Sequence, residues 1–246
     1  MIFLGSINAS ILRDLGFSAE DENKISMKVD NTLPFDTNKT YDAVVIGGGT
    51  GGLSFTKHAK KLGLSVAVFN YVRPTPKHKF KWGIGGTCVN VGCVPKKLFH
   101  NAGLIKQAIH MGKDYGWDVE LKNNKVKWER LRSNVQTHIR SLNDAYDINL
   151  KKIQADSINA EAMLGEEGEA NFTYNGKEYV IKADNFIIAT GGRPRYLENI
   201  PGSNFKFEEE AITSDDLFAL EKNPGKTLVV GGGYIGKVYL INEFSY

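Results

Sequence analysis

The stretch YDAVVIGGGTGG, residues Tyr41–Gly52, carries the strongest structural signal in the chain. Its first half is short, apolar and rich in β-branched residues, which favours a buried strand, and the glycines after it favour a tight turn into a helix. Beyond the helix and its predicted stop at Gly63, the apolar residues 65–69 (SVAVF) predict a second strand. These elements form one βαβ unit, so we expect an α/β protein with a Rossmann-like nucleotide-binding domain.

The glycines of this turn have the spacing of a dinucleotide-binding motif. Gly47 permits the tight turn, Gly49 lets the backbone approach a pyrophosphate, and Gly52 lets the helix pack against the strand. The phosphates would lie at the helix N-terminus, where N–H groups and the positive end of the dipole attract anions. A glycine-rich turn without a ligand is the alternative. At the end of the second strand, Asn70 replaces the usual acidic ribose ligand, so we expect weaker ribose binding.

The two cysteines of the chain lie in the stretch GGTCVNVGCVPKK, residues 85–97. A zinc site needs about four ligands, and Cys88 and Cys93 have no such companions. Residues five apart on an ideal helix have Cα atoms roughly 8–9 Å apart, whereas a disulfide needs less than about 7 Å. We therefore expect the pair where loop becomes helix, with Gly92 and Pro95 accommodating the distortion.

The chemistry of this position favours a redox-active disulfide. A helix N-terminus stabilises a thiolate, and Lys96 and Lys97 add positive charge nearby. Two buried and unreactive thiols are the alternative.

The rest of the chain continues in alternating helices and strands. Residues 98–109 and 128–146 have helical periodicity, whereas residues 160–188 have the texture of short strands with a hairpin turn at Asn175-Gly176. A strand then opens onto Thr190 and two glycines. A last predicted strand, residues 226–230, leads into a second glycine motif, GGGYIG, at residues 231–236.

Composition excludes several classes of function. The 246 residues carry a formal net charge of +3 with mixed signs, which indicates neither nucleic-acid nor membrane binding. No apolar run approaches the roughly 20 residues that span a bilayer. Residues 1–40 are polar and aperiodic, so we expect a flexible leader without a secretory signal. Two cysteines do not form a disulfide scaffold, which favours a reducing compartment; we expect the cytoplasm, with the mitochondrion as the alternative.

Residues 85–97 strongly resemble the active-site segment of the flavoprotein pyridine nucleotide-disulfide oxidoreductases. This family includes glutathione reductase, dihydrolipoamide dehydrogenase and the large thioredoxin reductases. The link NYVRPTPKHKFKWGIGGTC, residues 70–88, is similar to the thioredoxin reductases, since glutathione reductases have a shorter link. The stretches VQTHIRSLN, residues 135–143, and AITSDDLFALEKNPGKTLVVG, residues 211–231, point the same way.

The resemblance implies that FAD binds the first glycine motif. It also implies that Cys93 faces the flavin, that Cys88 passes electrons onward, and that Lys96 lies at the flavin and assists catalysis. It implies no metal. The implied FAD-binding residues are Gly47, Gly49, Thr50, Gly51, Gly52, Asn70, Thr87, Lys96, Ala170, Thr190 and Gly191.

The second glycine motif resembles the NADPH-binding turn of the same family. The implied NADPH-binding residues are Gly231, Gly233, Tyr234 and Gly236. A βαβ unit needs roughly 30 residues, so we expect residues 223–246 to form only the beginning of an NADPH domain, after an incomplete FAD domain at residues 41–222.

The resemblance also implies the reaction. Electrons pass from NADPH through flavin to the cysteine pair, and on to thioredoxin or a similar disulfide. Full-length relatives are homodimers, through a domain for which we find no counterpart here. Two alternatives stay open: a catalytically incompetent shortened isoform or fragment, and a relative of glutathione reductase or dihydrolipoamide dehydrogenase.

Overall fold

The computed structural model describes residues 33–118, 126–196 and 211–236. They divide into two compact units. Unit 1 contains the described residues of 1–72 and 140–191, and unit 2 contains those of 73–139 and 192–246. The expected FAD domain, residues 41–222, therefore contributes to both units.

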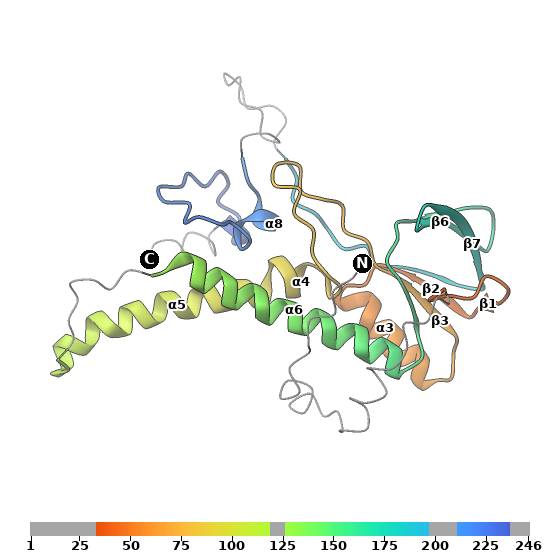
Figure 1. Cartoon of the computed structure of the whole chain (residues 1–246), viewed down its shortest axis with the longest axis horizontal. Coiled ribbons are helices and arrows are strands. Elements are labelled where there is room, and N and C mark those ends of the chain that lie inside the picture. Colours follow the sequence, from red (N-terminus) through yellow and green to blue (C-terminus); the bar gives the residue numbers. More distant parts are fainter. Residues whose placement is uncertain (1–32, 119–125, 197–210, 237–246) are drawn as a thin grey trace, which may run out of the picture. The chain divides into compact units, whose positions relative to one another are not determined.

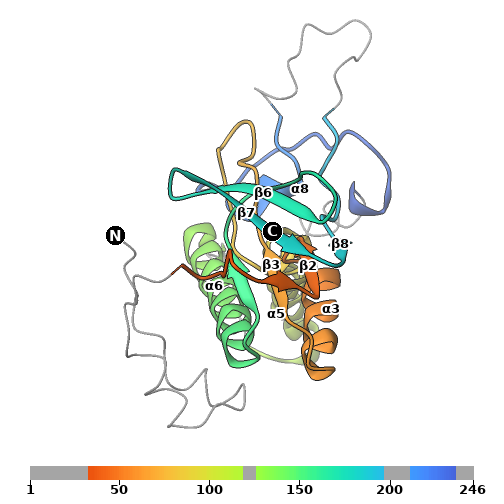
Figure 2. The same ribbon diagram turned by 90° about the vertical axis from the view of Figure 1, so that its right-hand side faces the viewer.

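A four-stranded parallel sheet forms the centre of unit 1. Its strand order is β4 (Asp156–Ile158), β3 (Val66–Phe69), β2 (Ala43–Ile46) and β8 (Phe186–Ile188). Helix α3 (Thr50–Lys61) connects β2 to β3 and packs beside both strands (Figure 2). β2 and β3 are almost completely buried, which explains their continuous apolar sequence. The expected Rossmann-like α/β architecture is confirmed.

A second sheet in unit 1 contains the expected meander. β5 (Ala162–Leu164), β6 (Glu169–Tyr174) and β7 (Lys177–Ala183) pair antiparallel, and β1 (Thr40–Tyr41) joins β7 in parallel. Asn175 and Gly176, with φ of 49° and 78°, form the two-residue turn between β6 and β7. The hairpin prediction is confirmed.

The core of unit 1 extends further toward the N-terminus than we expected. Phe35 is 6% exposed and makes edge contacts with the rings of Phe172, Tyr174 and Tyr179, at centroid distances of 5.1–5.4 Å. Burying an aromatic ring stabilises a fold by about 2 kcal/mol. Residues 33–40 are thus part of the folded unit. We expected them to belong to a flexible leader of residues 1–40, which is wrong for this segment. Residues 1–32 lie outside the described residues.

Helices dominate unit 2. They are α4 (Gly86–Val91), α5 (Cys93–Gly112), the 3₁₀ helix η1 (Lys113–Tyr115), the first half of α6 (Trp128–Lys152) and α8 (Ser214–Leu217). α5 runs beside this half of α6 (Figure 1). Phe99 of α5 forms a buried cluster with Trp128, Val135 and Ile139 of α6 and with Phe218 at the end of α8. The Trp128 indole donates to the carbonyl of Leu220 at 2.8 Å, which connects α6 to the chain after α8.

The acidic pair Asp215-Asp216 lies in the first turn of α8. Thr213 is the N-cap, and its side chain and that of Asp216 form a capping box, which satisfies N–H groups at the helix start. No group of acidic, His or Cys side chains in the described part of the chain has the arrangement of a metal site.

Residues 226–230 are irregular and not the strand that we predicted. No strand among the described residues pairs with them, and Leu228 is 87% exposed. A strand needs a neighbour that accepts and donates its backbone hydrogen bonds, so the β-branched sequence alone does not form one. Residues 234–236, in the second half of the glycine motif, form a helical turn.

Among the helices of the described ranges, none combines the length and the apolar character needed to cross a membrane.

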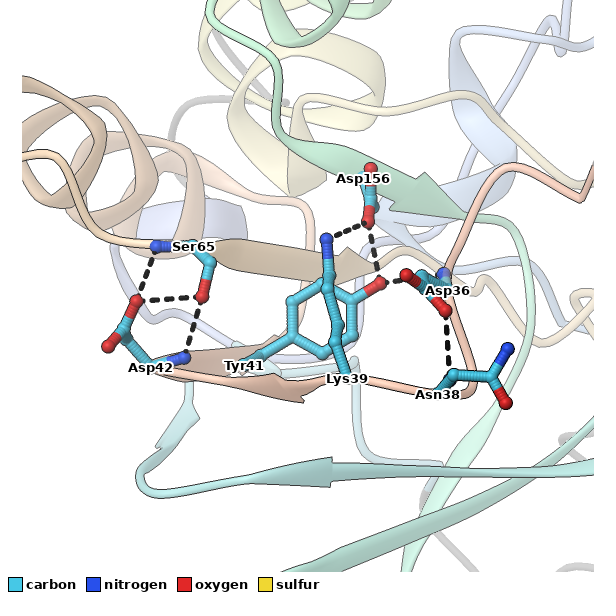
Figure 3. Close-up of polar contacts among 7 residues, drawn as sticks. All are labelled: Asp36, Asn38, Lys39, Tyr41, Asp42, Ser65 and Asp156. Atoms are coloured by element: carbon cyan, nitrogen blue, oxygen red, sulfur yellow. Dashed lines mark hydrogen bonds and ion pairs between the residues drawn. The ribbon is translucent and has the colours of Figure 1, made fainter.

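A buried tyrosine joins β1 to the edge strand of the parallel sheet (Figure 3). The Tyr41 hydroxyl donates to Oδ2 of Asp156 at 2.6 Å and accepts the N–H of Asp36 at 2.9 Å. Lys39 Nζ lies 3.3 Å from the same Asp156 oxygen and 4.3 Å from the centre of the Tyr41 ring. Burial and the hydrogen bond to Asp156 raise the pKa of Tyr41 well above its usual range.

Replacing Tyr41 with Phe tests this network. We expect the free energy of unfolding to fall by about 1 kcal/mol, the typical net contribution of one hydrogen bond. In the wild type the unfolded phenol ionises near pH 10 while the folded one stays neutral, so stability falls as pH rises above about 10. Urea unfolding at pH 8–11 should show a steeper decline for the wild type than for Tyr41→Phe. Equal slopes would contradict the role of Tyr41.

Candidate functional site

The first glycine motif forms a crowded turn in unit 1. Gly47 has φ of +123°, and a Cβ atom there would collide with the carbonyl of Ala189 at the end of β8. A Cβ atom on Gly52 would collide with the carbonyl oxygen of Gly47 and lie 2.9 Å from Cγ1 of Val45. Both positions therefore require glycine, as the sequence predicts.

Sequence reasoning gave no role to Gly48. A Cβ atom on Gly48 would lie 2.7 Å from Oδ1 of Asn70, so the missing side chain lets Asn70 lie against the turn. Asn70 itself follows β3, and its N–H donates to the carbonyl of Ile158 at 2.9 Å. The only sign of this role in the sequence is that Gly48 is the middle glycine of GGG. The G-x-G-x-x-G spacing of dinucleotide-binding motifs does not specify this position.

The residues of this turn fit the phosphates of a nucleotide. Gly49 is the N-cap of the 12-residue helix α3, and no side chain accepts the N–H groups of its first turn. That turn contains no acidic residue, and Thr50 and Gly51 are exposed. Free N–H groups and the positive end of the helix dipole together favour an anion at this position.

The ends of three parallel strands place the glycine turn and three other predicted FAD residues at one sheet edge. Asn70 follows β3, the glycine turn follows β2, and Thr190 and Gly191 follow β8. Ligands of open α/β sheets bind outside these carboxyl ends. Ala170 lies instead within β6 of the second sheet, with a fully buried side chain.

Cys88 and Cys93 form a disulfide in unit 2, and their Cα atoms are 4.6 Å apart. α4 ends at Val91, Gly92 has φ of −137° and ψ of −112°, and α5 begins at Cys93. A Cβ atom on Gly92 would lie 2.9 Å from the Thr87 carbonyl oxygen, so the close approach requires glycine. We expected the pair where a loop becomes a helix, but Cys88 lies inside α4, and the pair spans a joint between two helices. Gly92 accommodates the distortion at this joint.

The surroundings of the disulfide favour a thiolate after reduction. Cys93 is exposed and is the first residue of the 20-residue helix α5, whose N-terminus has no side-chain cap. The dipole of α5 therefore stabilises negative charge on Cys93. Lys96 lies in the next turn and is half-buried, whereas Thr87 is exposed and Cys88 is half-buried.

The second glycine motif repeats the local geometry of the first. Gly231 has φ of +115°, as Gly47 has +123°, and a Cβ atom on Gly236 would collide with the Gly231 carbonyl oxygen, as Gly52 would with Gly47. Gly233 is exposed, and Tyr234 is 80% exposed. The motif thus forms a nucleotide-type turn although the strand predicted before it is irregular.

Arg193 is a residue that sequence reasoning missed. Its Nε donates to Oδ2 of the buried Asp215 at 2.8 Å, and its guanidinium lies 4.6 Å from the centre of the Trp82 ring. A further N–H donates to the Arg73 carbonyl at 3.0 Å. Arg193 therefore ties α8 to the link that leads to the cysteines. Nothing in the local sequence indicates this, because the partners lie far apart along the chain.

Replacing Gly52 with Ala tests the crowding of the first turn. A collision between backbone atoms cannot be relieved by a rotamer change, so we expect a loss of about 3 kcal/mol in the free energy of unfolding. Gly192→Ala is the matched control, since nothing lies within 4 Å of its Cβ position. Urea unfolding should leave this control within about 0.5 kcal/mol of the wild type. Similar effects of both changes would contradict the steric argument.

Replacing Arg193 with Ala tests the contact with Asp215. Burial raises the pKa of the Asp215 carboxyl, and Arg193 opposes this rise. Without Arg193 the folded carboxyl binds its proton more tightly, and stability falls as pH rises above about 4, where the unfolded carboxyl ionises.

We expect Arg193→Ala to lose about 1–2 kcal/mol at pH 7, discounted for the partial exposure of the guanidinium, and less toward pH 4. Urea unfolding between pH 4 and pH 8, with the exposed Arg195→Ala as the control, measures this difference. A loss independent of pH would assign the effect to packing on Trp82.

Comparisons with known proteins agree with this geometry. Residues 41–239 match the family model described as pyridine nucleotide-disulphide oxidoreductase. The chain is 44% identical over 198 residues to the mitochondrial thioredoxin reductase 2 of Drosophila melanogaster, which covers 80% of this chain and 37% of that relative.

Two further relatives are thioredoxin reductases of Plasmodium falciparum, from isolates FCH-5 and 3D7. Each is 42% identical over 224 residues, which is 89% of this chain and 39% and 34% of the relatives. The chain thus spans less than two-fifths of the length of these relatives. The family model covers most of the chain, both glycine turns and the cysteine pair: the chain belongs to the pyridine nucleotide-disulphide oxidoreductase family.

Proposed function

We propose that this chain is part of an FAD-dependent disulfide oxidoreductase that passes electrons from NADPH to the Cys88–Cys93 pair and on to thioredoxin. The observation that carries the proposal is a disulfide at the N-terminus of a long helix, in a chain of this family. The names of the relatives, all thioredoxin reductases, favour thioredoxin over glutathione disulfide as the substrate.

The first glycine turn is the proposed site of the FAD pyrophosphate. Gly47 and Gly52 keep the turn compact, and the N–H groups of Thr50, Gly51 and Gly52 would hold the phosphates at the start of α3. Other proposed contacts are Gly49 at the pyrophosphate, Asn70 at the ribose, and Thr87, Lys96, Ala170, Thr190 and Gly191. Bound FAD supplies two-electron exchange between a nicotinamide and a disulfide.

The cysteines divide the proposed reaction between them. Two electrons and one proton break the Cys88–Cys93 bond, which leaves a thiol at Cys88 and a negative charge on Cys93 that the N-terminus of α5 and the cationic Lys96 stabilise. Cys88 then gives up its proton and attacks the disulfide of thioredoxin; a mixed disulfide forms with one thioredoxin sulfur, and the other sulfur leaves and takes up the proton. Attack by Cys93 on Cys88 restores the original disulfide, and the second thioredoxin sulfur leaves and takes a proton from the solvent, which releases thioredoxin with two thiols.

The second glycine turn is the proposed beginning of an NADPH site. Gly231 and Gly236 adopt the geometry of a nucleotide turn, and Gly233 and Tyr234 lie exposed between them. We propose residues 41–222 as the FAD domain and residues 223–246 as the start of the NADPH domain. A homodimer and a cytoplasmic or mitochondrial location are also proposals for the full-length protein.

Absorbance of the purified chain tests this function. A wild type that retains FAD should be yellow, and reduction by a dithiol should add a long-wavelength band from a thiolate beside the flavin. Cys93→Ser should lose this band, whereas Cys88→Ser should show it without added reductant, because Cys93 is then a free thiolate. The exposed Ser133→Ala is the matched control and should behave as the wild type. A colourless wild type after incubation with FAD would refute flavin binding by this chain.

A further inference from the structure

Asn90 lies between the two cysteines and is almost completely buried. It belongs to the last turn of α4, two residues after Cys88 and three before Cys93, and is 1% exposed. Its amide nitrogen donates to two carbonyls of the preceding loop, Gly83 at 3.2 Å and Ile84 at 3.4 Å, and to the carbonyl of Gly86 at the start of α4, at 2.8 Å. The side chain thus ties the end of α4 to the loop from which α4 begins.

The loop needs such a contact because its backbone is unusual. Gly85 and Gly86 both have left-handed conformations, with φ of 111° and 71°. The carbonyls of Gly83 and Ile84 in this loop accept hydrogen bonds from the Asn90 amide. Glycine is the most flexible residue in the unfolded chain, so two adjacent glycines are costly to order without a specific contact.

α4 itself is too short to be stable alone. It has six residues, and helices below about 12 residues are marginal without tertiary contacts. In the oxidised chain the Cys88–Cys93 bond holds α4 to α5. After reduction this covalent connection is absent, and the position of Cys88 depends on the non-covalent contacts of α4.

We propose that Asn90 is a positioning residue that keeps Cys88 beside Cys93 when the pair is reduced. This inference rests on the proposed function, in which the pair alternates between disulfide and dithiol. A dithiol whose sulfurs are held together closes to the disulfide more favourably than one whose sulfurs drift apart. Asn90 therefore makes the disulfide harder to reduce.

A glutathione redox buffer measures this effect on the whole 246-residue chain. Two glutathione thiols supply two electrons and two protons, the Cys88–Cys93 bond breaks, and glutathione disulfide forms. Free thiols are trapped with a maleimide, and mass spectrometry of the intact chain gives the fraction of reduced protein. The measurement reports this pair alone, because the chain has no other cysteine. Asn90→Leu keeps the volume and removes the amide donors, and the exposed Asn101→Leu is the matched control.

We expect Asn90→Leu to lower the equilibrium constant for disulfide formation about tenfold, which corresponds to a reduction potential about 30 mV higher. Asn90→Asp, which cannot donate at neutral pH, should shift it the same way, and Asn101→Leu should leave it unchanged. A lower melting temperature with an unchanged equilibrium constant would overturn the proposal, since a merely structural contact stabilises both redox states equally.

The wild type provides a test that does not depend on the folding of variants. If Asn90 holds α4 in place, amide hydrogen exchange of residues 86–91 should rise by less than about threefold on reduction. A rise above about tenfold would mean that α4 opens and would refute the proposal. Failure of the proposed function would appear separately, as a wild type that binds no FAD, and would leave both measurements valid.

Discussion

Close backbone contact between a strand and the helix after it is the constraint on which unit 1 depends. Gly52 lies against the Gly47 carbonyl, and Gly47 lies against the end of β8, so neither position has room for a side chain. This contact places the N-terminus of α3 at the carboxyl ends of the parallel strands. The close packing and the open N–H groups thus have one cause, because the glycines that permit the contact carry no side chain to cover the N–H groups.

In unit 2, a break between two helices allows the disulfide to form. An uninterrupted helix would keep Cys88 and Cys93 too far apart, and Gly92 breaks it so that the Cα atoms approach to 4.6 Å. The break also starts α5 at Cys93, so one glycine both permits the bond and gives the second cysteine a helix N-terminus. Asn90 and Arg193 both contact the chain that leads into this joint, Asn90 at Gly83 and Ile84 and Arg193 at Trp82.

The two glycine turns show how far local sequence determines local shape. Gly231 repeats the positive φ of Gly47, and Gly236 repeats the close contact that Gly52 makes with the first glycine, even though residues 226–230 do not form a strand. The turn depends on contacts within a few residues, so its spacing is sufficient to form it. A strand depends on a partner that its own sequence does not contain, and β propensity alone therefore gave a wrong prediction.

Short-range patterns of apolar residues and glycines were sufficient to predict three features from the sequence alone: the βαβ unit, the Asn175-Gly176 hairpin and the distortion at Gly92. The folded chain added contacts between distant residues: Phe35 in the core, Asn70 against Gly48, and Arg193 between Trp82 and Asp215. Short-range geometry repeats in many proteins, and the spacing of residues along the chain is sufficient to predict it. Long-range pairing depends on how elements pack, and no local pattern encodes which distant side chain fills a given space.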